Sequence, residues 1–109
     1  MTISLALRWL ITHTRLVPTV VRGEFEWDND KAQQNLTKHG VSFQEAATAM
    51  LDPRSIDLVD ELRPERLVTI GLSAGLRVLL VVSTENAERT RIISARKANA
   101  HERALYDEE

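Results

Sequence analysis

Two neighbouring helices, each with recognisable residues at its beginning and its end, constrain the fold of this chain most strongly. Asp28 is a suitable N-cap for the first helix, and Gly40 suits the left-handed position that follows its last turn. Ser42 and Glu45 predict a capping box at the start of the second helix, and Pro53 ends that helix. The segment therefore predicts two short helices joined by a tight turn.

The remainder of the chain changes to the periodicity of strands and then returns to a helix. We expect strands over residues 55–59, 66–71, 76–84 and 90–95. The third of these is nearly continuous in Val and Leu, which indicates a central position in a sheet. Asn99 and Glu102 predict the capping box of a last helix that ends near Tyr106. The predicted order is ααββββα, which is an α+β fold.

Composition limits the kinds of site that the chain can carry. A length of 109 residues suits one domain, and the absence of cysteine excludes disulfides and cysteine-ligated metals. The absence of disulfides also fits a cytoplasmic protein. The net charge of −2 argues against a generally basic nucleic-acid binder. However, the run from Arg89 to Lys97 holds four cations and no acid, which indicates a local site for an anion.

The first 23 residues differ in character from the rest of the chain. They carry three arginines and no acid, and their apolar start is interrupted by Arg8. A secretory signal would place its positive charge first, and the apolar stretch is too short to span a membrane. We therefore expect residues 1–23 to be an extension outside a domain that comprises residues 24–109. The alternative is a basic amphipathic arm that docks on a membrane or a partner.

Pairing of the last two predicted strands makes a geometric prediction. If the connection 85–88 closes a regular hairpin, Arg77 lies opposite Arg96, on the face that also carries Ser94. Two neighbouring arginines repel each other unless an anion lies between them, so this pair predicts an anion site. A shift of register by one residue would separate the pair.

One set of side chains suits the cleavage of RNA without a metal: His39, Lys38, Arg66, Arg77 and Arg96. Histidine transfers protons near neutral pH, and the planar guanidinium group binds phosphate through two hydrogen bonds. The histidines of the chain show no spacing typical of metal ligands, so we predict neither a metal nor a cofactor.

A structural explanation stands beside this functional one. The helix dipole alone favours Lys38 and His39 in a last helical turn. The strand arginines can be ordinary surface charges paired with glutamates. Arg96 and Lys97 are harder to explain in this way, because they precede a helix N-terminus, where a cation gains nothing from the dipole.

Three motifs carry a resemblance to a known family. They are Phe-Glu-Trp-Asp-x-x-Lys-x-x-x-Asn-Leu-x-Lys-His-Gly-Val-x-Phe-x-Glu-Ala from Phe25, Glu-Arg-x-x-x-Ile-Gly from Glu65, and Arg-x-Ile-Ser-Ala-Arg-Lys-Ala from Arg91. From Glu24 to about Tyr106 the chain resembles the BrnT toxins of bacterial type II toxin–antitoxin pairs.

The resemblance implies a RelE-like fold with two helices, an antiparallel sheet of three to four strands and a closing helix. It implies a cytoplasmic, metal-independent endoribonuclease that inhibits translation. It also implies a BrnA-like antitoxin with a ribbon-helix-helix part, a heterotetramer of toxin and antitoxin, and contact with operator DNA only through the antitoxin.

The family pattern carries over to nine positions: Trp27, Lys38, His39, Glu65, Arg66, Arg77, Ser94, Arg96 and Lys97. We expect the catalytic residues to be His39, Arg66, Arg77 and Arg96, and the RNA-binding residues to be Lys38, Ser94 and Lys97. The alternatives are a non-catalytic co-repressor module that only binds the antitoxin, or an inactive, degenerate toxin.

Overall fold

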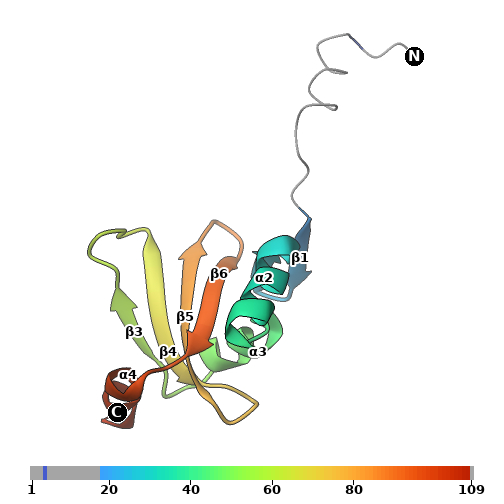
Figure 1. Cartoon of the computed structure of the whole chain (residues 1–109). Helices are drawn as coiled ribbons and strands as arrows, with labels where there is room; N and C mark the ends of the chain where they lie inside the picture. Colours follow the sequence, from blue (N-terminus) through green and yellow to red (C-terminus); the bar gives the residue numbers. More distant parts are fainter. Residues whose placement is uncertain (1–3, 5–17, 109) are drawn as a thin grey trace.

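Six strands and three helices make up the described part of the computed structural model, which comprises residue 4 and residues 18–108 (Figure 1). In chain order they are β1 (Thr19–Arg22), β2 (Phe25–Asp28), α2 (Asn29–His39), α3 (Phe43–Met50), β3 (Ile56–Val59), β4 (Arg66–Leu72), β5 (Val78–Glu85), β6 (Thr90–Lys97) and α4 (Ala100–Asp107). The strands form one sheet in the order β1-β2-β6-β5-β4-β3. None of the helices in the described part is long and apolar enough to cross a membrane.

The topology corrects part of the sequence prediction. The three helices and the four strands from β3 to β6 lie where we expected them, but the antiparallel sheet of three to four strands is wrong. β1 and β2 add two strands, and β2 pairs with β6 in parallel, so the sheet is mixed. Each added strand has only four residues, which is too short for its alternation to stand out from a loop.

β1 also belongs to the segment that we predicted to be an extension. Its residues Thr19–Arg22 pair with β2 and so form one edge of the sheet. Residues 1–3 and 5–17 lie outside the described residues, and the prediction for them stays a prediction.

The predicted caps fix where α2 and α4 begin and where α2 ends. The carboxylate of Asp28 accepts the backbone N–H of Asp30 at 2.8 Å, and Gly40 follows α2 with a φ of 68°. The Asn99–Glu102 capping box of α4 is confirmed, because each side chain accepts the other residue's backbone N–H at 2.9 Å.

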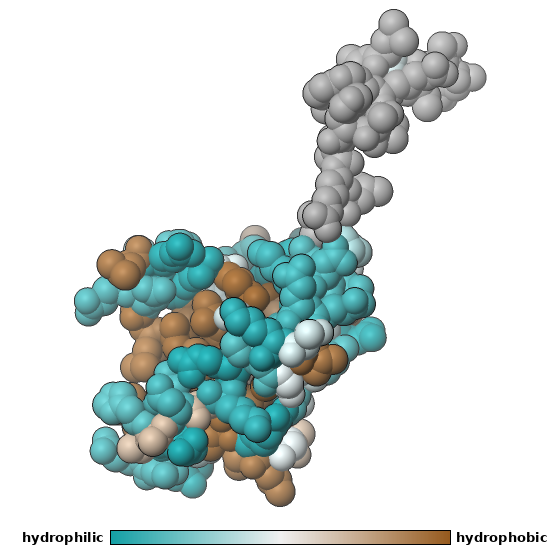
Figure 2. Space-filling model, viewed as in Figure 1, coloured by the Kyte–Doolittle hydropathy of each residue, from teal (hydrophilic) through white to brown (hydrophobic). Residues whose placement is uncertain are grey.

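The helices divide the two faces of the sheet between them. α2 and α3 cover one face, here called the helix face, around Trp27, Phe43 and Val81. α4 covers only part of the other face, where Tyr106 packs on Ile70 and Leu80. The uncovered part of that second face is here called the open face. Figure 2 shows apolar surface in its middle, over β3 to β5 and above α4.

Close contact between α3 and β4 holds the helix face together. A β-carbon added at Gly71 would lie 2.2 Å from the carbonyl oxygen of Ala49, so only glycine permits this approach. We expect Gly71→Ala to lower the free energy of unfolding by about 1–3 kcal/mol, measured by urea denaturation. Gln33→Ala is the control, because it changes an exposed side chain of α2 and should alter stability by less than about 0.5 kcal/mol. An equal loss in both variants would contradict this reading.

Candidate functional site

Three cross-strand rows of side chains define the open face. The row farthest from α4 contains Glu26, Arg91, Thr84 and Arg66. The middle row contains Ser94, Val82, Val68 and Leu58. The third row contains Arg96, Leu80, Ile70 and Ile56, and α4 packs on it through Leu105 and Tyr106. The first two rows therefore remain accessible, and they place an apolar middle row beside a row that carries Arg91 and Arg66.

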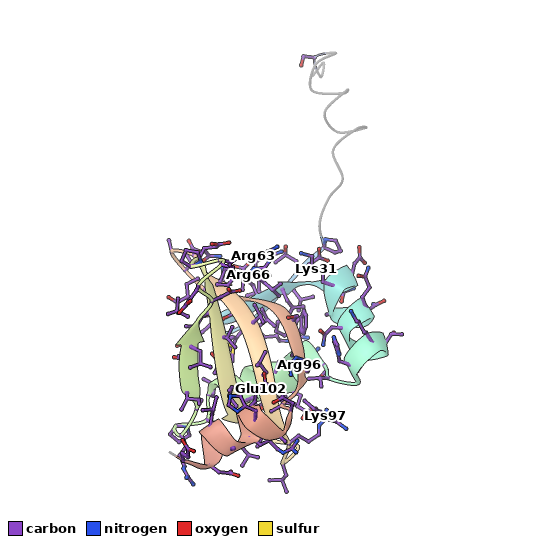
Figure 3. The ribbon with its side chains drawn as sticks, turned by 60° about the vertical axis from the view of Figure 1, so that its left-hand side comes forward. Lys31, Arg63, Arg66, Arg96, Lys97 and Glu102 are labelled. Carbon is purple, nitrogen blue, oxygen red and sulfur yellow. The ribbon has the colours of Figure 1, made fainter. Side chains whose placement is uncertain are left out.

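The three arginines of the open face differ in their partners. Within the described residues the Arg66 guanidinium has no hydrogen bond or ion pair. Arg91 contacts the Glu26 carboxylate at 2.5 Å. Arg96 donates two hydrogen bonds to the Glu102 carboxylate, at 2.7 and 2.8 Å. Figure 3 shows Arg66 at the end of the sheet away from α4, and Arg96 beside Glu102 near α4. Arg66 is thus the arginine of this face that is most available to an anion.

Asn35 attaches α2 to the edge of β6. β2 pairs with β6 only as far as Ile92, so the backbone of Ala95 lacks a strand partner on that side. The Asn35 amide replaces that strand, donating to the Ala95 carbonyl at 2.8 Å and accepting the Ala95 N–H at 3.1 Å. It also donates to the Val41 carbonyl at 2.9 Å. One buried side chain therefore fixes the position of α2 along β6.

A cleft of about 190 Å³ lies between α2 and β6, and three predicted site residues meet in it. Its walls are Lys31, Gln34, Asn35, Lys38 and His39 from α2, and Ile93 and Ser94 from β6. Because Ser94 also belongs to the middle row of the open face, the cleft opens at the border of that face. The structure thus brings Lys38, His39 and Ser94 together.

Arg77 and Lys97 do not join this group. Arg77 donates to the Glu45 carboxylate of α3 through two nitrogens and to the Gly40 carbonyl at 3.1 Å. Lys97 pairs with Leu79, which is buried in the helix-face core, and its charge helps to lower the pKa of Glu45 after the larger effect of the Arg77 hydrogen bond. Both cations therefore lie on the helix face of the sheet, away from the cleft.

The predicted pairing of Arg77 with Arg96 is wrong for two reasons. At the hairpin, each β5 residue meets a β6 residue two positions later than expected, so that Thr84 pairs with Arg91 rather than Arg89. A β-bulge between Val82 and Ser83 then shifts the register by one further residue. An odd shift moves every later side chain to the opposite face, and Arg96 lies beside Leu80 instead.

The capping box predicted for α3 forms only in part. Ser42 accepts the Glu45 N–H at 3.0 Å, but the Glu45 carboxylate does not return to Ser42. It binds Arg77 and also accepts the Ser73 hydroxyl at 2.6 Å. The Glu45 carboxylate binds Arg77 rather than the Ser42 N–H, because a hydrogen bond between two charged groups is stronger than one to a neutral N–H.

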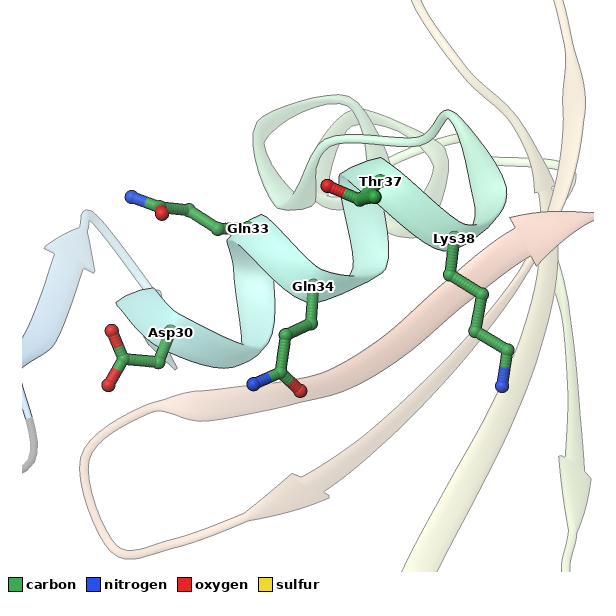
Figure 4. Close-up of a pocket in the computed structure, with 5 residues that line it drawn as sticks. All are labelled: Asp30, Gln33, Gln34, Thr37 and Lys38. Carbon is green, nitrogen blue, oxygen red and sulfur yellow. The ribbon is translucent and has the colours of Figure 1, made fainter.

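Another hollow, of about 490 Å³, follows the outer side of α2 (Figure 4). Its described lining residues all come from that helix: Asp30, Gln33, Gln34, Thr37 and Lys38. Side chains of one helix cannot converge on a ligand from several directions, so the cleft beside β6 is the better candidate site. Among the described residues, no three His, Asp or Glu side chains form a group that could hold a metal ion.

Sequence reasoning missed three residues of this region. Lys31 lies two turns before Lys38 on the cleft side of α2, and the helical period could have shown it. A regular strand over residues 90–95 places Arg91 and Ser94 on opposite faces, and only the β-bulge brings them to one face. Asn35 is a fixed position of the motif that begins at Phe25, but its structural role is recognisable only through the strand edge that it meets.

Replacing Asn35 tests how firmly α2 is attached. Asn35→Ala leaves the Ala95 N–H and two carbonyl groups without their partner, so we expect the free energy of unfolding to fall by about 2–4 kcal/mol in urea denaturation. Gln33→Ala, at an exposed position one half-turn away, should change it by less than about 0.5 kcal/mol. A small change in both variants would show that Asn35 does not anchor the helix.

Acid should loosen the attachment of α4. The Arg96 hydrogen bonds hold the pKa of Glu102 below its usual 4.5, and the Tyr106 hydroxyl, which donates to Asp52 at 2.6 Å, lowers the pKa of that carboxyl below 3.8. A lowered pKa in the folded state means that the unfolded chain binds more protons as the pH falls. Both groups therefore stabilise the fold above these usual values, and that contribution is lost as the pH falls through the lowered ones.

Urea denaturation at pH 7 and at about pH 3 measures this loss. We expect Glu102→Gln to reduce the difference between the two pH values, whereas Glu61→Gln in the exposed β3–β4 loop should leave it unchanged. Equal pH dependence in Glu102→Gln and the unmodified protein would contradict the role of the Arg96–Glu102 pair.

Comparison with known proteins gives a match over the part of the chain that contains the cleft. A family model for the ribonuclease toxin BrnT of type II toxin–antitoxin systems matches residues 27–102. The 1.1 Å crystal structure of the Brucella abortus ribonuclease toxin BrnT is similar, with a TM-score of 0.56 and 26% sequence identity. The similarity covers 67% of this chain and 92% of that chain. No curated protein matches the chain.

Proposed function

Because this chain belongs to the BrnT ribonuclease toxins of type II toxin–antitoxin systems, we propose that it cleaves RNA on its open face and so inhibits translation. The observation that carries the proposal is the arrangement of free cations around that face. Arg66 lies at one end without a partner among the described residues, and the cleft with Lys38 and His39 opens at the border next to Ser94.

His39 is the proposed general base. Its imidazole takes the proton of the 2′-hydroxyl, the 2′-oxygen attacks the phosphorus, and the bond to the 5′-oxygen breaks. The departing 5′-oxygen takes a proton from water, and a 2′,3′-cyclic phosphate remains. Lys38 offsets the negative charge that develops on the phosphate, and the Ser94 hydroxyl offers it a hydrogen bond.

Arg66 is proposed to bind a second phosphate of the same strand. β4 and β6 are separated by two strand spacings, about 10 Å, so a few nucleotides laid across the apolar middle of the face would join Arg66 to the cleft. Arg96 can reach the same strand only from within its ion pair with Glu102. The positions of Arg77 and Lys97 do not support their predicted contact with this RNA.

Cleavage of labelled RNA in the presence of EDTA tests the proposal and its metal independence. We expect products that end in a 2′,3′-cyclic phosphate. His39→Ala should slow cleavage by about 100- to 10,000-fold and Arg66→Ala by about 100-fold. Arg22→Ala removes an exposed arginine from β1, at the far edge of the sheet, and should cleave normally. Undiminished cleavage by both His39→Ala and Arg66→Ala would refute this site.

A non-catalytic, antitoxin-binding co-repressor is the second candidate. Its specific support is that Glu45 and Glu102 already bind two of the four predicted catalytic residues, Arg77 and Arg96. In either case we propose a BrnA-like antitoxin with a ribbon-helix-helix part as the partner, a heterotetramer, and contact with operator DNA through the antitoxin. Tight antitoxin binding without any RNA cleavage would favour the co-repressor, and loss of both activities would indicate a degenerate toxin.

A further inference from the structure

We propose that the outer edge of β3 and the loop that follows it form the docking site of the antitoxin, which binds by adding an extended strand to the sheet. The inference rests on the antitoxin partner of the proposed function but not on ribonuclease activity. It therefore stands or falls separately from the RNA site.

The first reason is the unpaired backbone of β3. β3 is the last strand in the sheet order and pairs only with β4 among the described residues. Its outer side thus presents backbone N–H and C=O groups to solvent, which an extended segment of another chain can pair with. A helix cannot satisfy such a row of groups, so the occupant must be a strand.

The second reason is that two common protections against pairing are missing from this edge. Edge strands often carry lysine or proline, whereas β3 reads Ile-Asp-Leu-Val. The charge of Asp57 is directed back to β4, where its carboxylate accepts the Thr69 hydroxyl at 2.8 Å. An edge of this kind can pair with a strand of another chain unless a specific partner covers it.

Exposed apolar side chains line the same edge on both sides. Leu58 is 41% exposed and shares the open face with Val68, while Val59 is 67% exposed and points to the opposite side. Leu62, in the following loop, is 93% exposed. A partner strand with apolar residues at alternate positions, followed by one more apolar residue for Leu62, would bury all three.

The position of this edge also explains how binding can block the RNA site. A strand added to β3 extends the open face by one strand, so the antitoxin chain that leaves it can run over Val68 and Val82. A carboxylate of that chain can pair with Arg66, which lacks a partner among the described residues. One docking event would then cover the apolar middle of the face and neutralise the arginine proposed to hold RNA.

Charged substitutions at the edge test the docking site. The probe is the full-length antitoxin encoded beside this chain, and the double variant Val59→Asp, Leu62→Asp should bind it at least about 100-fold more weakly. The control, Leu51→Asp with Leu76→Asp, also charges two exposed leucines, 64% and 81% exposed, outside β3 and its loop, and should bind within about threefold of the unmodified protein. Unchanged affinity in the edge variant would overturn the proposal.

RNA cleavage separates this proposal from the proposed function. Both double variants should cleave RNA at the unmodified rate, because neither changes the cleft or Arg66. An edge variant that still cleaves but escapes the antitoxin supports the docking site. An unmodified protein that never cleaves RNA would refute the ribonuclease and leave the binding result unaffected.

Hydrogen exchange on the unmodified protein gives an independent measurement that needs no variant. The amides of Ile56–Val59 that point away from β4 should exchange at least about tenfold more slowly in the complex than in the free chain, since a new strand would bond them. No slowing in a saturated complex would overturn strand addition. If RNA or self-association of the free chain, and not the antitoxin, slows the exchange of these amides, a different molecule occupies the edge. That result would also overturn the proposal.

Discussion

The attachment of Asn35 to the open edge of β6 is the contact on which the rest of the site depends. β2 ends its parallel pairing at Ile92 because the chain turns into α2, and the next backbone groups of β6 would otherwise be buried without partners. Asn35 supplies the missing bonds from the helix itself. The same contact places Lys38 and His39 one turn further along α2, opposite Ser94, so a requirement of sheet pairing creates the cleft.

Three carboxylates decide which arginines remain available. Glu26 of β2 binds Arg91, and the other two, Glu45 and Glu102, lie at helix starts. Glu45 and Glu102 occupy equivalent positions in α3 and α4, and each binds an arginine at or beside the end of a strand. On the helix face, Arg77 is used to join α3 to the turn after α2. On the open face, Arg96 is used to hold α4. Arg66 has no such partner in the part of the chain that the structure describes, and this difference, rather than the number of cations, gives the open face its free positive charge.

Local signals predicted local structure well, and long-range pairing is where they failed. The caps at Asp28, Gly40 and Asn99 depend on a few adjacent residues and were predicted correctly. The parallel pairing of β2 with β6 joins residues more than sixty positions apart, and no short-range pattern encodes it. The bulge beside Val82 likewise has no signature, yet it moved Arg77 and Arg96 to opposite faces. The membership of Lys38, His39 and Ser94 in one site remains a prediction from the family pattern that this geometry favours.

Binding of RNA to the open face can be observed directly by titrating the ¹⁵N-labelled protein with a short RNA whose 2′-hydroxyls are methylated, so that cleavage is blocked. The account predicts shifts of the backbone amide signals of Arg66, Thr84 and Ser94, which lie in the two accessible rows of that face, together with Lys38. The amides of Phe43 and Arg77, which belong to the helix face, should stay in place. Shifts confined to the helix face, with Thr84 and Ser94 unchanged, would contradict the account.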